Sequence, residues 1–270
     1  MDNPLIYICS NSLQKKDATD LLKERIGFLE WTTGERILDI GCGPGDVTST
    51  VLFPLLPKDT TLVACDISEE MIKYCSKFIK NDRISFKTQD IQQKEITNLQ
   101  VESFNKIFSF YCLHWISDHR QAMQNIYSLL KPGGEILLMF ITPDNPVIMT
   151  MNKLKDLDKW SKFIKDQQWF YKCDDPPSFF HDILKDVGFH NINCYLQKKN
   201  HHYPSLEALT TLLKAINPYL RYIPDELKSE YIQDMIDLLK QGGFVKYDTV
   251  NEDLIIEYNI IVAVAQKLEK

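Results

Sequence analysis

One short stretch of sequence limits most strongly what this chain can fold into. The apolar run Ile37 to Ile40 leads into a turn with three glycines, Gly41 to Gly45, and a helical pattern begins at Val47. Glycines allow the backbone to approach a ligand closely, and the start of a helix presents unpaired N–H groups. The stretch therefore predicts an α/β fold with a ligand-binding site at the carboxyl end of its first strand.

Residues 36 to 141 alternate between short β-rich runs and amphipathic stretches. Such an alternation favours a parallel sheet with right-handed βαβ crossovers. Ser68 suits the N-cap of the second helix. The expected strands cover residues 36–40, 61–65, 84–88, 106–110 and 135–141, and the expected helices cover 47–56, 69–79 and 120–130.

From residue 145 onward the pattern changes. Residues 146–187 and 205–241 are mostly helical in spacing and rich in aromatic side chains, and two further β-like runs lie at 192–197 and 254–265. Any single aromatic residue there can belong to a second small core. Helices beside the open edge of a sheet can also form the wall of a substrate pocket, so we expect a helical substrate cap.

Composition and charge exclude several classes of function. The chain has 31 Lys and Arg against 37 Asp and Glu, a formal net charge of -6, so nucleic acid is not an expected partner. Its seven cysteines form no C-x-x-C pair and no metal-ligand spacing, so we expect reduced thiols, no metal and a cytoplasmic location. No secretory signal is visible, and no apolar run approaches the ~18 residues that a membrane-spanning helix needs.

Two classes of cofactor compete for the glycine turn. A dinucleotide fingerprint requires G-x-G-x-x-G, whereas Gly45 comes one residue early and Asp46 stands where the last glycine would be. Asp39 precedes the turn, Asp66 ends the second expected strand and Asp90 ends the third. Asp66 is placed to bind ribose hydroxyls, and Asp90 could accept from an adenine amino group. Three acidic strand ends suit a cationic nucleoside better than a pyrophosphate.

In this order the motifs resemble the class I S-adenosylmethionine-dependent methyltransferases. The resemblance covers about residues 30–142 and includes Leu129 to Gly134 before the fifth strand. It implies a Rossmann-like sheet of seven strands, mostly parallel with an antiparallel last strand, and S-adenosyl-L-methionine as the cofactor with S-adenosyl-L-homocysteine as its product. The residues expected to bind the cofactor are Asp39, Gly41, Cys42, Gly43, Gly45, Asp66, Ile67, Met71, Asp90, Ile91, Ser109 and Phe110.

The loop after the fourth expected strand, Tyr111 to Ile116, lies where substrate and methyl group meet in this fold. It contains no Asn-Pro-Pro-Tyr-like signature of amino-group methylation and no Pro-Cys nucleophile of cytosine chemistry. It offers an indole N–H at Trp115 and an imidazole at His114. Either side chain could instead be an ordinary core residue.

This loop and the N-terminal segment together resemble the insect juvenile hormone acid methyltransferases. In that family the segment reads Leu-Tyr-x-x-x-Asn-x-x-Gln-[KR]-x-Asp-Ala. Here it matches from Leu5 through Tyr7 and Asn11 to Gln14 and Ala18, with one residue inserted between Leu5 and Tyr7. The resemblance continues over nearly the whole chain, through 65–71, 125–130, 159–160, 186–189 and 215–218.

The resemblance implies methylation of the carboxylate of a sesquiterpenoid, farnesoic acid or juvenile hormone acid, in juvenile hormone biosynthesis. A carboxylic acid with a pKa of ~4–5 is already ionised at neutral pH, so in-line attack on the sulfonium methyl needs no general base. The carboxylate needs to be positioned, which two neutral donors can do. By analogy with carboxyl methyltransferases we assign these donors to Gln14 and Trp115, and His114 is the third candidate catalytic residue.

A farnesyl tail is a long apolar chain that favours a deep pocket. Burial at ~0.8 kcal/mol per CH₂ would make the tail the main source of affinity. The residues expected to contact the substrate are Tyr7, Gln14, Trp115, Trp160, Phe163, Trp169, Phe170 and Tyr219.

We expect four parts in the chain. Residues 1–30 form an N-terminal gating segment and helix, and residues 31–142 form the cofactor-binding core. Residues 143–250 form helical cap insertions, interleaved with a sheet strand near 190–198, and residues 251–270 form the final core strand. The expected partner is the lipophilic acid, and both a monomer and a homodimer remain open.

Two alternative functions remain open at this point. The chain could be an O- or N-methyltransferase of another small molecule that uses His114 as a general base. It could also be a relative that binds a terpenoid without turning it over. Intact glycines and acidic strand ends at Asp39, Asp66 and Asp90 argue against this second alternative.

Overall fold

A mixed sheet forms the centre of the computed structural model, which describes residues 3–164, 171–248 and 253–269. The strand order is β3-β2-β1-β4-β5-β8-β6, and a short strand, β7, pairs with β8. The strands are β1 (Arg36–Ile40), β2 (Thr61–Asp66), β3 (Ile84–Thr88), β4 (Phe104–Phe110), β5 (Leu130–Ile141), β6 (His190–Tyr203), β7 (Val245–Asp248) and β8 (Asp253–Gln266).

The sheet has the mostly parallel arrangement that the sequence predicts. Strands β1 to β5 pair in parallel, whereas β8 lies antiparallel to both β5 and β6. The seven expected strands are all present among the described residues, and β7 adds an eighth. This strand has only four residues with an exposed middle pair, so its alternation is too short to indicate a strand from the sequence.

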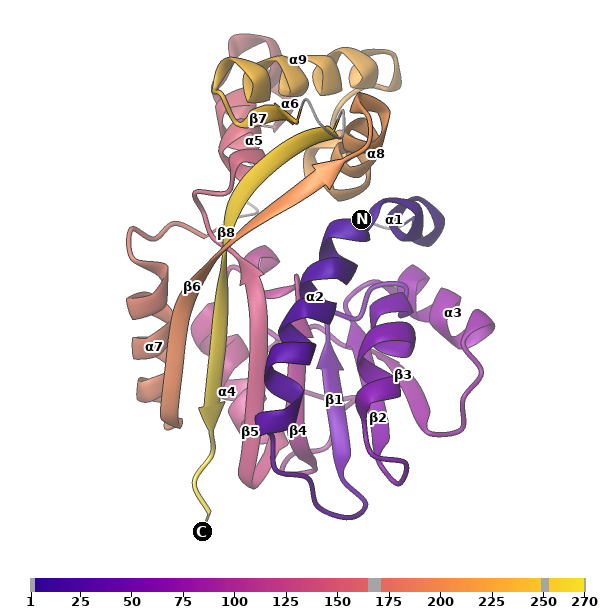
Figure 1. Cartoon of the computed structure of the whole chain (residues 1–270), viewed down its shortest axis with the longest axis vertical. Coiled ribbons are helices and arrows are strands. Elements are labelled where there is room, and N and C mark those ends of the chain that lie inside the picture. The colour runs from indigo at the N-terminus through magenta and orange to yellow at the C-terminus, as the bar shows by residue number, and fades with distance from the viewer. Residues whose placement is uncertain (1–2, 165–170, 249–252, 270) are drawn as a thin grey trace.

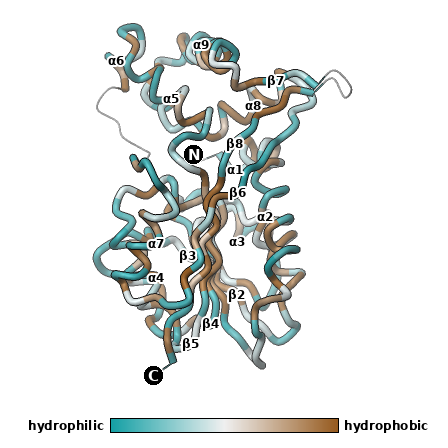
Figure 2. Tube along the Cα trace, turned by 60° about the vertical axis from the view of Figure 1, so that its left-hand side comes forward, coloured by the Kyte–Doolittle hydropathy of each residue, from teal (hydrophilic) through white to brown (hydrophobic). Residues whose placement is uncertain are grey.

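Helices cover both faces of the sheet. Ile37 packs into one hydrophobic core and Leu38 into the other, because successive residues of a strand point to opposite faces. Figure 2 shows α2 and α3 on one side of the strands and α4 and α7 on the other. The helices are α1 (Pro4–Ser10), α2 (Ser12–Arg25), α3 (Glu69–Phe78), α4 (His119–Leu129), α5 (Pro146–Asp156), α6 (Asp158–Ile164), α7 (Pro176–Val187), α8 (Leu206–Ile216) and α9 (Lys228–Gln241).

Two local predictions can be checked against the helices near the glycine turn. Ser68 is the N-cap of α3, and its hydroxyl accepts a hydrogen bond from the N–H of Met71. The segment expected as a helix over 47–56 is helical but irregular, with a π-helix at Thr48–Leu52 and a 3₁₀ turn at Phe53–Leu55. Pro54 contributes to this irregularity because it has no N–H to donate to a preceding turn.

The helices α5, α6, α8 and α9 gather above the carboxyl ends of the strands and form an upper body (Figure 1). The long strands β6 and β8 extend into this upper body while still paired with each other, up to Tyr203 opposite Leu254. Helix α7 lies within the segment expected to form the cap, but it packs against β6 and α4 on the face of the sheet.

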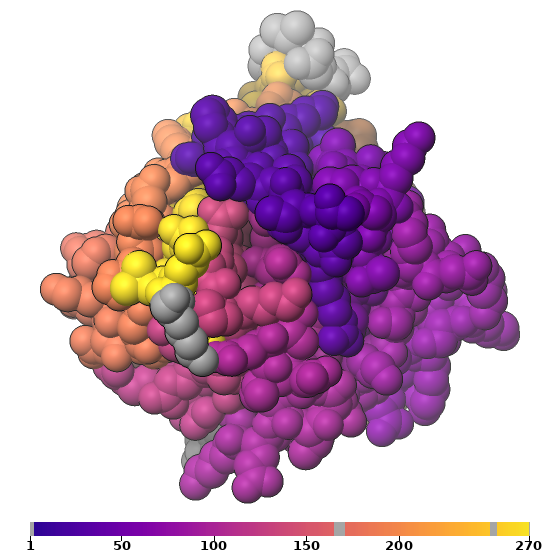
Figure 3. All heavy atoms as spheres, turned by 90° about the horizontal axis from the view of Figure 1, so that it is seen from below, coloured from indigo at the N-terminus to yellow at the C-terminus, as the bar shows by residue number. Residues whose placement is uncertain are grey.

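The N-terminal segment joins the two halves of the molecule. Helix α2 crosses in front of the central strands, and α1 lies just below the upper body, where it contacts α3 and α8 (Figure 1). From below, α2 (indigo) is seen beside the residues of β5 (pink), and the surface around them is closely filled (Figure 3). The N-terminal segment therefore reaches the carboxyl ends of the strands from one side.

Candidate active site

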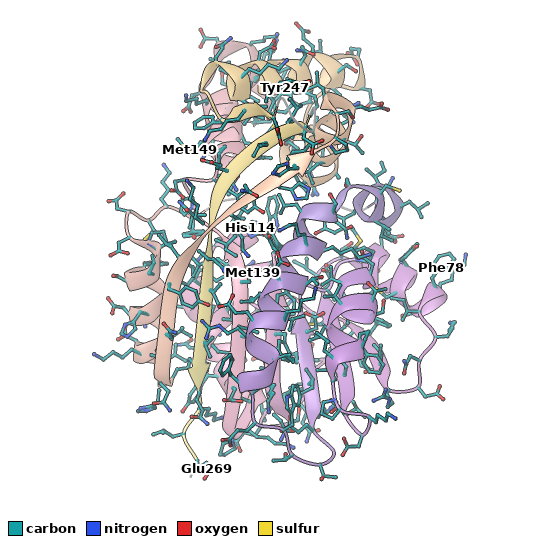
Figure 4. The ribbon with its side chains drawn as sticks, in the orientation of Figure 1. Phe78, His114, Met139, Met149, Tyr247 and Glu269 are labelled. Atoms are coloured by element: carbon teal, nitrogen blue, oxygen red, sulfur yellow. The ribbon has the colours of Figure 1, made fainter. Side chains whose placement is uncertain are left out.

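A cavity of about 430 Å³ lies between the carboxyl ends of the strands and the upper body. The sheet contributes strand ends and loops to its wall, α1 and α2 contribute Tyr7 and Gln14, and α5, α8 and β8 close it from above. His114 lies at this junction of the two halves (Figure 4). Residues from the first and last quarters of the chain thus meet in one chamber.

The glycine turn after β1 has the geometry that its sequence predicts. Gly41, Gly43 and Gly45 all have positive φ angles, of 74°, 53° and 77°. A Cβ on Gly41 would overlap the side chain of Cys112, and one on Gly45 would lie 2.8 Å from the Sγ atom of Cys75. The turn therefore requires glycine for its close packing as well as for its backbone conformation.

The residues expected around the adenosine come together at the ends of β2 and β3. Asp66 accepts hydrogen bonds from the backbone N–H groups of Gly43, at 2.8 Å, and Ser68, at 2.9 Å. Asp90 lines the same cavity, and its Oδ1 atom accepts from the N–H of Gln92. Ile67 is 64% exposed, which leaves an apolar face open beside these carboxylates. The members of the expected set that line the cavity are Gly41, Gly43, Asp66, Ile67, Met71, Asp90 and Ile91.

The remaining expected cofactor residues are buried outside the lining of the cavity. The Thr48 hydroxyl donates to the Oδ2 atom of Asp39 at 2.6 Å, and that of Ser109 donates to the Ile40 carbonyl at 2.9 Å. Burial, together with the nearby charge of Asp66, raises the pKa of Asp39 to about 7 against the opposing effect of the hydrogen bond from Thr48. The expected cofactor residues that are buried outside the cavity lining are Asp39, Cys42, Gly45, Ser109 and Phe110.

The candidate catalytic residues all line the cavity. Gln14 is only 7% exposed, and its Oε1 atom has no hydrogen-bond partner among the residues that the structure describes. Trp115 is half-buried on the 3₁₀ turn Leu113–Trp115, next to His114. Burial lowers the pKa of His114 to about 3, with a smaller contribution from His119, so the imidazole is neutral at pH 7.

Several aromatic residues expected to contact the substrate lie elsewhere. Trp160 is fully buried in the upper body, where its indole N–H donates to Asp234 at 2.9 Å and its ring packs edge-to-face on Tyr231. Contrary to our expectation, Trp160, Phe163 and Tyr219 are not part of the cavity lining.

The large side chains of Trp160 and Tyr219 fill the core of the upper body, and Phe163 packs against that core. Tyr7 does line the cavity, whereas Trp169 and Phe170 lie outside the described residues.

Sequence reasoning missed most of the upper wall. Ile148 and Met151 on α5, and Leu212 and Ile216 on α8, have the helical spacing of a buried face, but the spacing does not say what that face meets. Tyr111 belongs to the loop Tyr111 to Ile116 that the sequence indicated, but its hydroxyl was not considered as a functional group. The other lining residues that the sequence did not indicate include Asn145, Tyr203, Arg221, Ile256 and Tyr258.

Metal sites and membrane spans were searched for in the described parts of the chain. Within 3–164, 171–248 and 253–269 no cluster of His, Cys, Asp and Glu side chains could hold a metal ion. Over the same ranges, no helix has the length and apolar character needed to cross a membrane.

Comparison with known proteins places the fold in a class. Residues 38–136 match a family described as a methyltransferase domain. The structure resembles that of phosphoethanolamine N-methyltransferase 2 from Haemonchus contortus, solved with S-adenosylhomocysteine, with a TM-score of 0.56 and 19% identity over 94% of this chain and 53% of that chain. The fold and the glycine-turn site define a methyltransferase that uses S-adenosylmethionine.

The chain also has two full-length relatives. It is 34% identical to the juvenile hormone acid O-methyltransferase of Bombyx mori, over 99% of this chain and 98% of the relative. It is equally similar to the enzyme of the same description from Drosophila melanogaster, over 99% of this chain and 93% of the relative. The chain belongs to the family of juvenile hormone acid O-methyltransferases.

The cavity fits the cofactor of this family. The exposed face of Ile67 lies beside the two acidic strand ends Asp66 and Asp90, and Gly41 and Gly43 leave room for a close approach of the ligand. A purine can pack on the apolar face while its ribose and amino group bind the carboxylates. The acidic surroundings, which include the buried Asp39, suit the positive charges of S-adenosylmethionine.

Proposed function

We propose that this enzyme transfers a methyl group from S-adenosylmethionine to the carboxylate of a sesquiterpenoid acid, farnesoic acid or juvenile hormone acid, in juvenile hormone biosynthesis. One observation carries the proposal. A single cavity joins the acidic strand ends Asp66 and Asp90 to the neutral donors Gln14 and Trp115 and to an apolar upper wall. These are the three environments that the cofactor, the carboxylate and the terpenoid tail require.

The two donors come from distant parts of the chain. Gln14 lies on α2 and Trp115 on the turn after β4. An amide and an indole can each donate one hydrogen bond to a carboxylate without neutralising it, so they orient the oxygen and leave it nucleophilic. Bound in this cavity, S-adenosylmethionine supplies an electrophilic methyl group on its sulfonium.

The apolar wall supports a lipophilic substrate. Ile148, Met151, Leu212, Ile216 and Ile256 face the cavity from α5, α8 and β8. Each CH₂ group of a tail buried against them contributes ~0.8 kcal/mol to binding. The carboxylate then sets the orientation of the substrate, and the tail supplies most of the affinity.

A role for His114 as a general base has little support. Its pKa, lowered to about 3, makes its imidazole a weak proton acceptor, and its Nδ1 atom is buried without a partner in the described structure. A carboxylate substrate also has no proton to give up at neutral pH. We therefore assign His114 to the wall of the cavity beside Trp115.

The N-terminal residues 1–30 are proposed to gate the cavity. The side-chain amide of Asn11 donates to both carboxylate oxygens of Asp46, at 3.0 and 2.8 Å, and Lys15 lies 3.1 Å from the same carboxylate. Asp46 follows the glycine turn directly, so these contacts hold α1 and α2 against the cofactor site. Tyr7 and Gln14 would leave the cavity wall if the contacts broke.

Transfer of a labelled methyl group tests the proposed function. Farnesoic acid, juvenile hormone acid and a straight-chain fatty acid would be compared as acceptors, and we expect methyl esters of the two sesquiterpenoids. Gln14→Ala and Trp115→Phe should each lower kcat by about a hundredfold or more, whereas His114→Asn should lower it by less than about tenfold. A preference for the fatty acid would refute the sesquiterpenoid assignment. A silent Gln14→Ala together with an inactive His114→Asn would refute the positioning mechanism.

The cell compartment and the assembly of the enzyme are also part of the proposal. We place the reaction in the cytoplasm, where seven free cysteines stay reduced. The chamber described above is built from one chain, which is compatible with a monomer or a homodimer. Fractionation of the cells and sedimentation of the purified protein test these two points.

A further inference from the structure

Asp17 is part of the N-terminal motif, yet the proposed reaction does not use it. It lies on α2 one turn after Gln14 and is fully buried. Both the Tyr111 and the Tyr258 hydroxyls donate to its Oδ2 atom, the latter at 2.7 Å. One carboxylate thus joins α2, the loop after β4 and strand β8.

The two phenols face the cavity in which the substrate carboxylate would lie. A tyrosine hydroxyl has one proton to donate. Because Asp17 accepts both protons, the phenol oxygens of Tyr111 and Tyr258 have none left for a ligand. The cavity wall would otherwise hold two hydroxyl donors in addition to Gln14 and Trp115.

The backbone of Tyr111 shows that its position is held by its surroundings. Its φ angle is 57°, in the left-handed region that a bulky residue rarely adopts. Its N–H donates to the carbonyl of Met139 at 2.8 Å, and its hydroxyl is fixed by Asp17. The same residue begins the loop that carries Trp115.

We propose that Asp17 is a positioning residue that withholds the phenol protons of Tyr111 and Tyr258 from the substrate. The carboxylate of the acid is then left with the donors Gln14 and Trp115, which hold it for attack. The inference rests on the proposed function and adds a reason why the substrate carboxylate is held in one orientation. It assigns no contact between Asp17 and the substrate.

The surroundings of Asp17 raise its pKa overall, because burial outweighs the contacts that favour the charged form. Burial raises its pKa, while the hydrogen bonds from Tyr111 and Tyr258 and the charges of Lys199 and Lys16 act in the opposite direction. The Oδ1 atom has no partner within the described ranges, so the two phenols are the hydrogen-bond donors that the structure shows for this side chain. Both phenol hydroxyls in turn donate to this carboxylate.

Replacing Asp17 by asparagine keeps the shape of the side chain and weakens its capacity as an acceptor. Both phenols donate to one oxygen of Asp17, and an amide oxygen accepts them more weakly than a carboxylate does. The phenol protons then pass more readily to the substrate carboxylate, which they can bind away from the methyl group. We expect Asp17→Asn to lower kcat at least about tenfold, while KM for the acid stays the same or falls and KM for S-adenosylmethionine is unchanged. A merely structural role would raise both KM values together with a fall in Tm.

Asp20 provides a matched control on the same helix. It lies one turn after Asp17, is partly exposed, and pairs with Lys16 at 2.8 Å. We expect Asp20→Asn to leave kcat and both KM values within about twofold of the wild type.

Removal of the freed donors gives a second test. When both Tyr111 and Tyr258 are replaced by phenylalanine in the Asp17→Asn protein, kcat should recover at least about fivefold relative to Asp17→Asn alone. A structural defect would instead become worse with each further change. No recovery in a protein that is folded by circular dichroism would overturn the proposal.

A binding experiment separates this inference from the proposed function. Calorimetry would compare farnesoic acid and farnesol on the enzyme loaded with S-adenosylhomocysteine. We expect Asp17→Asn to bind the acid about threefold tighter than the wild type and the alcohol equally well. Equal or weaker binding of the acid would overturn the role of Asp17, whatever the turnover. Turnover of neither sesquiterpenoid acid by the wild type would instead refute the proposed function.

Discussion

Replacing Asp39 by asparagine should change how the stability of the protein depends on pH. This carboxylate is 3% exposed at the end of β1, and the hydroxyl of Thr48 is its hydrogen-bond donor. Burial, with the charge of Asp66, raises its pKa from 3.8 to about 7. The folded protein therefore holds this proton more tightly than the unfolded chain. The stabilisation that this bound proton contributes is fully present below pH 3.8 and is lost as the pH rises to about 7.

The size of the effect follows from the two pKa values. A rise from 3.8 to about 7 corresponds to about 4 kcal/mol of lost stability above neutral pH. Asparagine has no charge, but its amide leaves a buried donor without a partner, which costs about 1–3 kcal/mol at any pH. Near pH 4 we expect Asp39→Asn to be less stable than the wild type by about 1–3 kcal/mol, the cost of the buried amide. Near pH 8 the wild type has lost about 4 kcal/mol, so we expect the variant to be more stable by about 1–3 kcal/mol.

Urea unfolding without cofactor, followed by circular dichroism across this pH range, measures the difference directly. The other buried acids are present in both proteins, so their contributions to the pH dependence cancel in the difference between the two stability curves. Parallel stability curves for Asp39→Asn and the wild type would refute the assignment of a raised pKa. Calorimetry at pH 7 adds a check, because a cationic cofactor should displace a proton from the wild type and none from position 39 of the variant.

Three further changes test individual contacts. Gly41→Ala should lower the affinity for S-adenosylmethionine at least about tenfold because its Cβ overlaps Cys112, whereas Gly34→Ala, with a similar φ but open space, should not. Asp46→Ala should speed trypsin cleavage within the first 30 residues, and an unchanged digestion pattern would contradict the gating role. Trp160→Phe should cost about 1–3 kcal/mol in urea unfolding and leave kcat/KM within about twofold, since the indole lies outside the cavity.

The sheet and the cofactor side of the site could be predicted because their signals are local. Apolar runs end at Asp39, Asp66 and Asp90, and in a parallel sheet the carboxyl ends of neighbouring strands meet at one edge. Placing Gln14 beside Trp115 came from the resemblance to a family, because nothing in the spacing of α2 indicates which loop it meets. The structure brings both to one cavity.

The upper wall could not be predicted because it depends on how distant elements pack. Trp160 and Tyr219 were weighted for their size, yet large aromatic rings are also what fills a small core, and that is where they lie. Strand β6 extends beyond the run expected at 192–197, because its paired extension into the upper body carries the polar residues Lys198 to His202, which give no apolar signal in the sequence. The Asp17 cluster joins residues that are 94 and 241 positions apart, so no sequence window contains it.

The shared strands β6 and β8 have a consequence for how this enzyme can change over evolution. Their ladder runs without interruption from Asn193 opposite Val264, inside the sheet, to Tyr203 opposite Leu254, in the upper body. Along these two strands, the part that binds the cofactor and the part that walls the substrate share one continuous ladder of the described residues, which couples them mechanically. Side chains on α5 and α8 line the cavity without taking part in this ladder, so we expect changes of substrate preference to arise by replacing them while the shared strands are kept.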